Sequence, residues 1–224
     1  MTEKLRPRHE LEQALERIAK TIEFKDAHLE LTSDARTGEN LLTFIREHFL
    51  PDEVLAKSLG YDMDEEFDQL FTIVHKDNLS LLLISDKTDE IIACRTIVLA
   101  NRAKSFDFSK LKNDKLIKVF IFLTHKNEEM DVYKRFNIDT CIDFVFLGTH
   151  KKHRKQGIAS KIFQAALQFS KELGINPVCI KGEGSGIYSQ RVYEKSGFET
   201  LHTFKYDDYK VDGDIVFKDT GIFQ

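Results

Sequence analysis

A cluster of basic residues around one glycine is the most chemically suggestive stretch of the sequence. The segment KKHRKQGIA covers residues 151–159 of a chain whose net charge is −4. An apolar run, Cys141–Leu147, precedes the cluster, and a helix-like run follows it to Leu173. This order predicts a strand, a turn and a helix whose first N–H groups lack intrahelical partners and attract negative charge. Gly157 would let a phosphate approach the backbone, and no acidic residue occurs between Lys151 and Ser170, so the turn is predicted to bind an anion.

A second set of residues carries hydroxyl groups at a regular spacing. Ser185, Ser189 and Tyr193 are four residues apart in turn, which would place them along one edge of a helix if helical geometry held throughout. Ser185 is alternatively the N-cap of that helix. Such hydroxyl groups can donate or accept protons in a reaction.

The elements that must position these residues alternate along the chain. Apolar periodicity predicts a leading helix over 8–22, and alternation or apolar runs predict strands. The other predicted helices cover Asp34–Phe49, a part of 52–76, most of 107–136, Gly157–Leu173 and Tyr188–Ser196. The predicted strands are Ala27–Ser33, two between 79 and 100, Cys141–Leu147, Pro177–Lys181, and two last ones in 198–217. We expect an α/β (α+β) fold, with one central mixed sheet and a βαβ unit over 141–181.

Composition excludes several classes of protein. With 224 residues, 42% of them hydrophobic, the chain suits one domain, or a domain with an appendage. Its three cysteines are far apart and odd in number, which favours neither disulfides nor a zinc site. The charged N-terminus lacks the apolar core of a signal peptide, and no apolar run approaches membrane-spanning length. We therefore expect a cytoplasmic protein with no metal, membrane or nucleic-acid partner.

At this point the residues resemble a known family. Arg154–Ala159, RKQGIA, is similar to the acetyl-CoA signature of the GNAT N-acetyltransferases, and Arg191–Phe198, RVYEKSGF, is similar to the second signature of that family. The stretch 184–217 resembles in particular the invertebrate arylalkylamine, or dopamine-type, N-acetyltransferases. Glu47–Leu59 resembles the loop that carries the proposed general base of those enzymes, which would be Glu53 here.

The resemblance implies a GNAT fold over residues 27–224, preceded by a leading helical extension over 1–26. It implies acetyl-CoA as co-substrate, a small primary amine as acceptor, and direct transfer in a ternary complex. The implied catalytic residues are Glu53, Tyr193, Ser185 and Ser189. The implied cofactor-binding residues are Leu147, Gly148, Thr149, Arg154, Lys155, Gln156, Gly157, Ile158, Ala159 and Ser189.

Acetyl transfer to an amine requires the same groups on chemical grounds. An alkylamine has a pKa of about 10.4, so a base such as Glu53 must remove a proton, directly or through a water. The departing thiolate benefits from an acid. A phenol with a pKa of about 10 protonates a thiolate better than an aliphatic hydroxyl does, so Tyr193 ranks above Ser189 as the acid.

Other interpretations of the same residues stay open. The basic run is alternatively a solvated or nucleic-acid-binding face, Glu53 an N-cap or surface charge, the two serines helix caps, and Tyr193 a packing partner of Phe198. The glycines at 182, 184 and 186 have the wrong spacing for a dinucleotide-binding GxGxxG turn. A polyamine or protein amine as acceptor, and a non-catalytic acetyl-CoA sensor, are the rival functions, and the oligomeric state is open.

Overall fold

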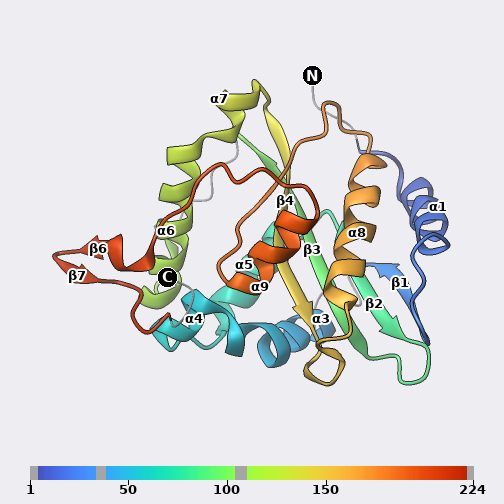
Figure 1. Ribbon diagram of the computed structural model, residues 1–224, viewed down its shortest axis with the longest axis horizontal. Helices are drawn as coiled ribbons and strands as arrows, with labels where there is room; N and C mark the ends of the chain where they lie inside the picture. The colour runs from blue at the N-terminus through green and yellow to red at the C-terminus, as the bar shows by residue number, and fades with distance from the viewer. Residues whose placement is uncertain (1–4, 34–38, 104–109, 221–224) are drawn as a thin grey trace.

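A five-stranded mixed sheet runs through the computed structural model, which describes residues 5–33, 39–103 and 110–220 (Figure 1). The strands stand in the order β1-β2-β3-β4-β5. Their bounds are β1 Ala27–Leu31, β2 Leu81–Ser85, β3 Ile91–Asn101, β4 Thr140–Thr149 and β5 Ile180–Gly182. Neighbours from β1 to β4 are antiparallel, whereas β4 and β5 are parallel and are joined through α8 (Ile158–Lys171). The predicted mixed sheet and βαβ unit are confirmed.

Helices cover both faces of the sheet. In Figure 1, α8 and α9 cross in front of β3 and β4, and α5 lies behind the sheet. The helices of the α8 side are α1 Arg8–Ala19, α8 and α9 Ile187–Lys195. The helices that pack on the other side are α3 Glu39–Phe44, α4 Val54–Leu59, α5 Glu65–Val74 and α6 Asp114–Met130, which α7 Val132–Phe136 follows.

The sequence of β2 shows why two apolar cores form. Leu81 and Leu83 belong to the core under α1 and α8, whereas Leu82 and Ile84 belong to the core under α3 and α5. Successive side chains of a strand point to opposite faces, so a continuous apolar strand is buried on both sides.

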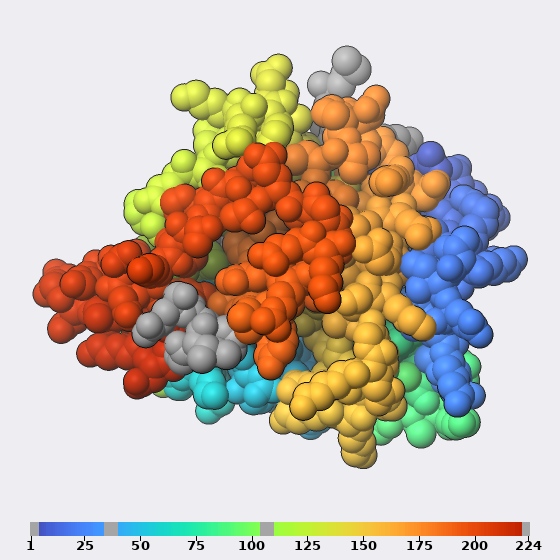
Figure 2. All heavy atoms as spheres, viewed as in Figure 1, coloured from blue at the N-terminus to red at the C-terminus, as the bar shows by residue number. Residues whose placement is uncertain are grey.

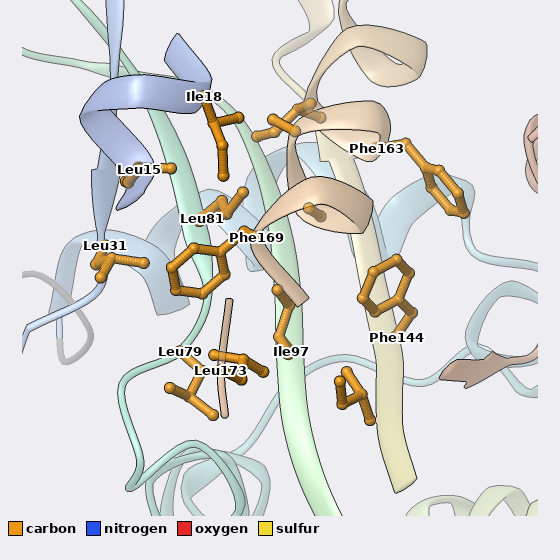
Figure 3. Close-up of a cluster of buried hydrophobic side chains, with 14 of the residues drawn as sticks. Leu15, Ile18, Leu31, Leu79, Leu81, Ile97, Phe144, Phe163, Phe169 and Leu173 are labelled. Carbon is orange, nitrogen blue, oxygen red and sulfur yellow. The ribbon is translucent and has the colours of Figure 1, made fainter. Parts of the chain in front are cut away.

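The leading helix α1 belongs to the first of these cores. Leu15 and Ile18 lie near Leu81 and Phe169 in Figure 3, and both are buried, as their helical spacing predicted. The Arg8 guanidinium also donates hydrogen bonds to the backbone oxygens of Thr32 and Asn78, which holds α1 against the edge of the sheet. The division of the chain at residue 26 stays a prediction.

The segment before α4 is less regular than the sequence predicted. Of the predicted helix Asp34–Phe49, residues 34–38 lie outside the described residues, and α3 ends at Phe44. A π-helical turn, Ile45–Phe49, and a 3-10 turn, Leu50–Asp52, follow. Pro51 has no N–H to donate, which prevents a regular helix from continuing through this turn.

The two last strands are much shorter than predicted. Residues 198–205 have no regular secondary structure, and a 3-10 turn, Tyr206–Asp208, and the two-residue strands β6 Lys210–Val211 and β7 Asp214–Ile215 follow. Aromatic side chains anchor this segment: Phe204 and Tyr206 pack on Phe122 of α6. Figure 1 shows the red C-terminal segment running beside α6 to the hairpin. Side-chain packing thus replaces the backbone pairing that alternation alone predicted.

Within the described part of the chain, no helix has the length and apolar character needed to cross a membrane. The same residues contain no group of three or more histidine, cysteine or acidic side chains arranged to hold a metal ion.

Candidate active site

Strands β4 and β5, at one edge of the five-stranded sheet, separate after a short paired segment. They pair only from Ile142 opposite Ile180 to Phe144 opposite Gly182, where β5 ends, while β4 continues to Thr149. Among the residues that the structure describes, the side of β4 that faces β5 therefore has no strand partner beyond Phe144. Such a gap exposes backbone hydrogen-bonding groups of β4 to a ligand.

A bulge between β3 and β4 lies at the same level. The register shifts between Arg95 and Ile97, so that Arg95 pairs with Leu147 and Ile97 with Phe144. Thr96 lies on β3 within this irregularity, and its hydroxyl oxygen accepts a 2.7 Å hydrogen bond from the Phe146 amide. A bulge re-aims the side chains around it.

That loop has the geometry predicted for an anion-binding turn. After β4, a 3-10 turn, Lys151–His153, leads to Lys155 and Gly157, both with positive φ, 62° and 75°. Gly157 is the N-cap of α8, without a side-chain cap, and a Cβ placed on it would meet no atom within 4 Å. The first amides of α8 therefore have no side-chain cap and lie at the positive end of the helix dipole.

Arg154 is held by the segment that carries Glu53. Its guanidinium forms a 2.6 Å ion pair with Asp52 and donates to the backbone oxygens of His48 and Thr149. Figure 2 shows the gold loop at the surface beside the cyan segment. No acid was expected here from the local sequence, yet the fold supplies Asp52 from about a hundred residues upstream. Both side chains are partly exposed, so the pair adds little stability.

Two histidine rings also join these segments. His48 and His150 lie with their ring centroids 3.9 Å apart. Burial lowers the pKa of both rings; the charge of His150 lowers the pKa of His48 further, and that of His153 does the same for His150. The His150 ring nitrogen Nδ1 accepts from the amide of Lys152, so His150 caps the 3-10 turn. The two rings therefore favour their neutral forms.

Glu53 is the N-cap of α4. Its Oε2 atom accepts a 2.8 Å hydrogen bond from the Ala56 amide, and its side chain is half-buried. The interpretation of this residue as a cap is therefore confirmed, and it does not exclude a second role, because the cap uses one of the two carboxylate oxygens. Helix α4 ends at Gly60, which has the left-handed conformation typical of helix C-termini.

Tyr206 connects the Glu53 turn to the turn before α9. Its hydroxyl donates to the Ser185 backbone oxygen at 2.8 Å. Burial raises the pKa of Tyr206, and the negative charge of Glu53 raises it further. Sequence reasoning missed this residue, since a tyrosine within an acidic segment has no distinctive spacing. Only the fold brings it beside Glu53.

The two serines differ in their surroundings. Ser189 donates to the Gly186 oxygen at 2.8 Å and accepts from the Gly186 amide at 3.3 Å, so it closes the first turn of α9. The N-cap is Gly186, and the interpretation of Ser185 as N-cap is wrong, because the chain is still extended at Gly186. Among the described residues, the Ser185 hydroxyl makes no hydrogen bond, and it lies outside the helix that was to align it with Tyr193.

Tyr193 is buried where β4 and β5 separate. It is only 7% exposed; its hydroxyl donates to the Phe144 oxygen at 3.1 Å and accepts from Arg95 at 2.6 Å. Gly182 makes room for it, since a Cβ there would lie 2.0 Å from the hydroxyl oxygen. Its ring also packs edge-on against Phe198, with centroids 4.9 Å apart, which confirms the packing interpretation. Burial raises the pKa of Tyr193, and the charge of Arg95 opposes that rise.

An aromatic cluster lies next to Glu53. Val54 and Leu55 of α4 form an apolar core with aromatic side chains of α6 and the C-terminal segment. The aromatic members are Phe122, Phe204, Tyr206, Tyr209 and Phe217. Phe122 contacts the other four rings, with centroids between 4.8 and 6.0 Å away. The Glu53 turn is thus followed by a buried aromatic core, in which Phe204 and Tyr209 are the half-buried aromatic members.

Comparison with known proteins supports the description of the fold. The model of the acetyltransferase (GNAT) family matches residues 42–198. Arylalkylamine N-acetyltransferase 2 from Aedes aegypti superposes with a TM-score of 0.79 and 21% identity, over 86% of this chain and 92% of that one. A Drosophila melanogaster polyamine N-acetyltransferase that forms N-acetylagmatine superposes with a TM-score of 0.73 and 19% identity, over 86% and 93%. The family match covers most of the chain, and the fold is that of these structures; this protein belongs to the GNAT acetyltransferase family.

Proposed function

We propose that this chain transfers the acetyl group of acetyl-CoA to a small primary amine of the arylalkylamine class, directly and within a ternary complex. The observation that carries the proposal is the separation of β4 from β5. At this point lies the Tyr193 hydroxyl, with the Gly157 loop at one end of the gap. Tyr206 links the Glu53 turn to the turn before α9.

The donor site is formed by the end of β4 and the loop after it. The backbone at Leu147, Gly148 and Thr149 and the loop Arg154–Ala159 would hold acetyl-CoA, which supplies an activated acetyl thioester. The uncapped start of α8 and the open space at Gly157 fit a pyrophosphate. Lys155 and the neighbouring lysines would add attraction for it. Gln156, Ile158 and Ala159 contribute backbone amides or complete the turn, and Ser189 shapes the start of α9.

Glu53 is the proposed general base. The amine arrives protonated, and Glu53 removes its proton directly or through a water, so that the nitrogen lone pair can attack. The carboxylate is held in place by the Ala56 amide and is only half-buried, so one oxygen can accept the proton. Tyr206 supports the Glu53 turn, because it packs with Val54 and Leu55 and its hydroxyl is hydrogen-bonded to the Ser185 oxygen.

Tyr193 is the proposed general acid. Its hydroxyl lies at the last paired residue of β4, where a thioester placed between the separating strands would break. Ser189 is less suited, since its hydroxyl is used to close the first turn of α9. Ser185 has an uncommitted hydroxyl among the described residues and is proposed to contact the amine or a relaying water.

The half-buried rings of Phe204 and Tyr209, in the aromatic core next to Glu53, support an aromatic amine as acceptor. Rings pack favourably against rings, and they also attract the ammonium group of an arriving amine. A polyamine is the second candidate, because the exposed carboxylates of Asp207 and Asp208 follow Tyr206 directly and could bind a second cationic group.

The experiment is release of CoA thiol from acetyl-CoA across a panel of amines: dopamine, tyramine, octopamine, serotonin, spermidine, agmatine and N-terminal peptides. Turnover by an aromatic monoamine at least about tenfold above the others in kcat/KM supports the proposal. Preference for spermidine or agmatine would support the second candidate. Binding of acetyl-CoA without turnover of any amine would overturn both and favour an acetyl-CoA sensor.

A further inference from the structure

A buried arginine lies in the core beneath the gap between β4 and β5. Arg95 of β3 is 1% exposed, and its guanidinium carbon lies 4.3, 5.0 and 5.5 Å from the ring centroids of Phe144, Phe163 and Tyr193. Figure 3 shows the Phe163 ring of α8 next to the Phe144 ring of β4, and the two rings pack edge-to-face with centroids 5.4 Å apart. An arginine is an unexpected residue in such a core, because burying a cation is costly unless it is neutralised.

Arg95 has no neutralising partner of the usual kind. Among the described residues, no carboxylate lies within ion-pair distance of it, and its Nε atom has no hydrogen-bond acceptor. Asp143 of β4 attracts it only over a longer distance and is itself paired with Lys181. The aromatic rings provide cation–π attraction, which compensates a part of the lost hydration.

Within the described parts of the chain, the one side-chain hydrogen bond of Arg95 goes to the proposed acid. Its Nη2 atom donates to the Tyr193 hydroxyl oxygen at 2.6 Å, while that hydroxyl donates to the Phe144 oxygen at 3.1 Å. Gly182 lies close to the same oxygen, since a Cβ built on it would be 2.0 Å away. The phenol is therefore held at one position, with a cation beside the atom that would lose a proton.

We propose that Arg95 is a positioning residue for acetyl transfer: it orients the Tyr193 hydroxyl and stabilises the phenolate that remains when Tyr193 gives up its proton. The inference rests on the proposed function, in which Tyr193 is the acid. As the amine nitrogen bonds to the acetyl carbon, the C–S bond breaks and the sulfur takes its electron pair. The sulfur then receives the phenol proton, and the phenolate regains a proton from water.

This arrangement strengthens as the reaction proceeds. Before transfer, the guanidinium faces a neutral phenol, and afterwards it faces a phenolate at the same distance, so the attraction grows mainly in the transition state. The other charged groups that act on the phenol are Asp143 and Glu183, which disfavour a phenolate, and Lys181 lies between those two carboxylates. Arg95 is thus the cation that offsets them.

A double-mutant cycle tests the inference. Arg95→Met, which keeps length without charge, and Arg95→Lys, which keeps the charge, are each made in the wild type and in Tyr193→Phe. CoA release is followed with acetyl-CoA and tyramine, and with acetyl-CoA and water alone, which also requires C–S cleavage. Arg95→Met should lower kcat about 10- to 100-fold, Arg95→Lys less, and the KM for acetyl-CoA should stay within about twofold. In Tyr193→Phe, Arg95→Met should lower kcat by less than about twofold.

The outcomes separate the two claims. If Tyr193→Phe leaves kcat unchanged, Tyr193 is not the general acid, and the role inferred for Arg95 is overturned as well. If Tyr193→Phe lowers kcat but Arg95→Met lowers it by the same factor in both backgrounds, or not at all, only the role of Arg95 is overturned. Thermal unfolding and acetyl-CoA binding of each variant show that it is folded; should Arg95→Met not fold, Arg95→Lys and Tyr193→Phe complete the same cycle.

Discussion

A methyl group added at Gly182 should damage both the stability and the activity of this protein. The Cβ of Gly182→Ala would lie 2.0 Å from the Tyr193 hydroxyl oxygen, 2.7 Å from its Cζ atom and 2.9 Å from the Phe144 oxygen. Moving the Tyr193 side chain away would cost free energy, because Arg95 and the Phe144 oxygen hydrogen-bond its hydroxyl and the Phe163 and Phe198 rings pack on its ring.

The size of the effect follows from these contacts. Overpacking of a core typically costs about 1–3 kcal/mol, and displacing the hydroxyl from Arg95 loses a charged hydrogen bond of about 1.5–3 kcal/mol. We expect Gly182→Ala to lower the free energy of unfolding by about 3 kcal/mol, or the Tm by roughly 6–12 °C. Because the proposed acid moves, kcat should also fall about 100-fold, while acetyl-CoA still binds.

Urea unfolding and CoA-release kinetics provide the assay, and Tyr193→Phe provides the second background. Removal of the hydroxyl relaxes the nearest contact from 2.0 to 2.7 Å, so Gly182→Ala should cost about 1–2 kcal/mol less in Tyr193→Phe. A matched control is Gly213→Ala, which adds a methyl to open space at φ 87° and should cost about 1 kcal/mol without changing kcat. An equal cost of Gly182→Ala in both backgrounds would refute the reasoning.

Four further changes have defined outcomes. Gly157→Glu should abolish acetyl-CoA binding measured by calorimetry, because it places a bulky anion where the pyrophosphate would lie; unchanged binding would contradict the donor site. Glu53→Gln keeps an oxygen for the Ala56 amide, so kcat should fall at least about 100-fold with little change in Tm, and normal turnover near neutral pH would exclude Glu53 as base. Tyr206→Phe keeps the ring but loses the hydrogen bond to the Ser185 oxygen, so kcat/KM for the amine should fall about tenfold while the KM for acetyl-CoA stays unchanged. An equal effect on both substrates would argue against a role of Tyr206 on the amine side. Burial lowers the pKa of His75 from 6.5 to about 4, so below pH 6.5 the unfolded chain binds a proton that the folded protein excludes. The free energy of unfolding should therefore fall by about 2 kcal/mol as the pH falls from 7.5 to 5. His75→Phe should remove this pH dependence in urea unfolding, and an unaltered pH dependence would exclude His75 as its source.

The local sequence determined the elements whose signals are local. The strand, turn and helix around Gly157 follow from apolar runs that flank a glycine, and the apolar face of α1 follows from its helical spacing. These features depend on residues within a few positions of one another, so they can be read from the chain before it folds. The two signature segments likewise indicated the family that the comparison confirmed.

Only the tertiary structure decided which side chains of the candidate site lie next to one another. Asp52 beside Arg154, Tyr206 beside Glu53 and Arg95 beneath Tyr193 are contacts between residues about 100 or more positions apart, and no periodicity encodes them. The C-terminal segment was mispredicted for the same reason, since its aromatic side chains pack on Phe122 of α6 while its backbone forms only the two-residue strands β6 and β7. Packing of distant side chains, which alternation cannot express, therefore determines the structure around the proposed acceptor site.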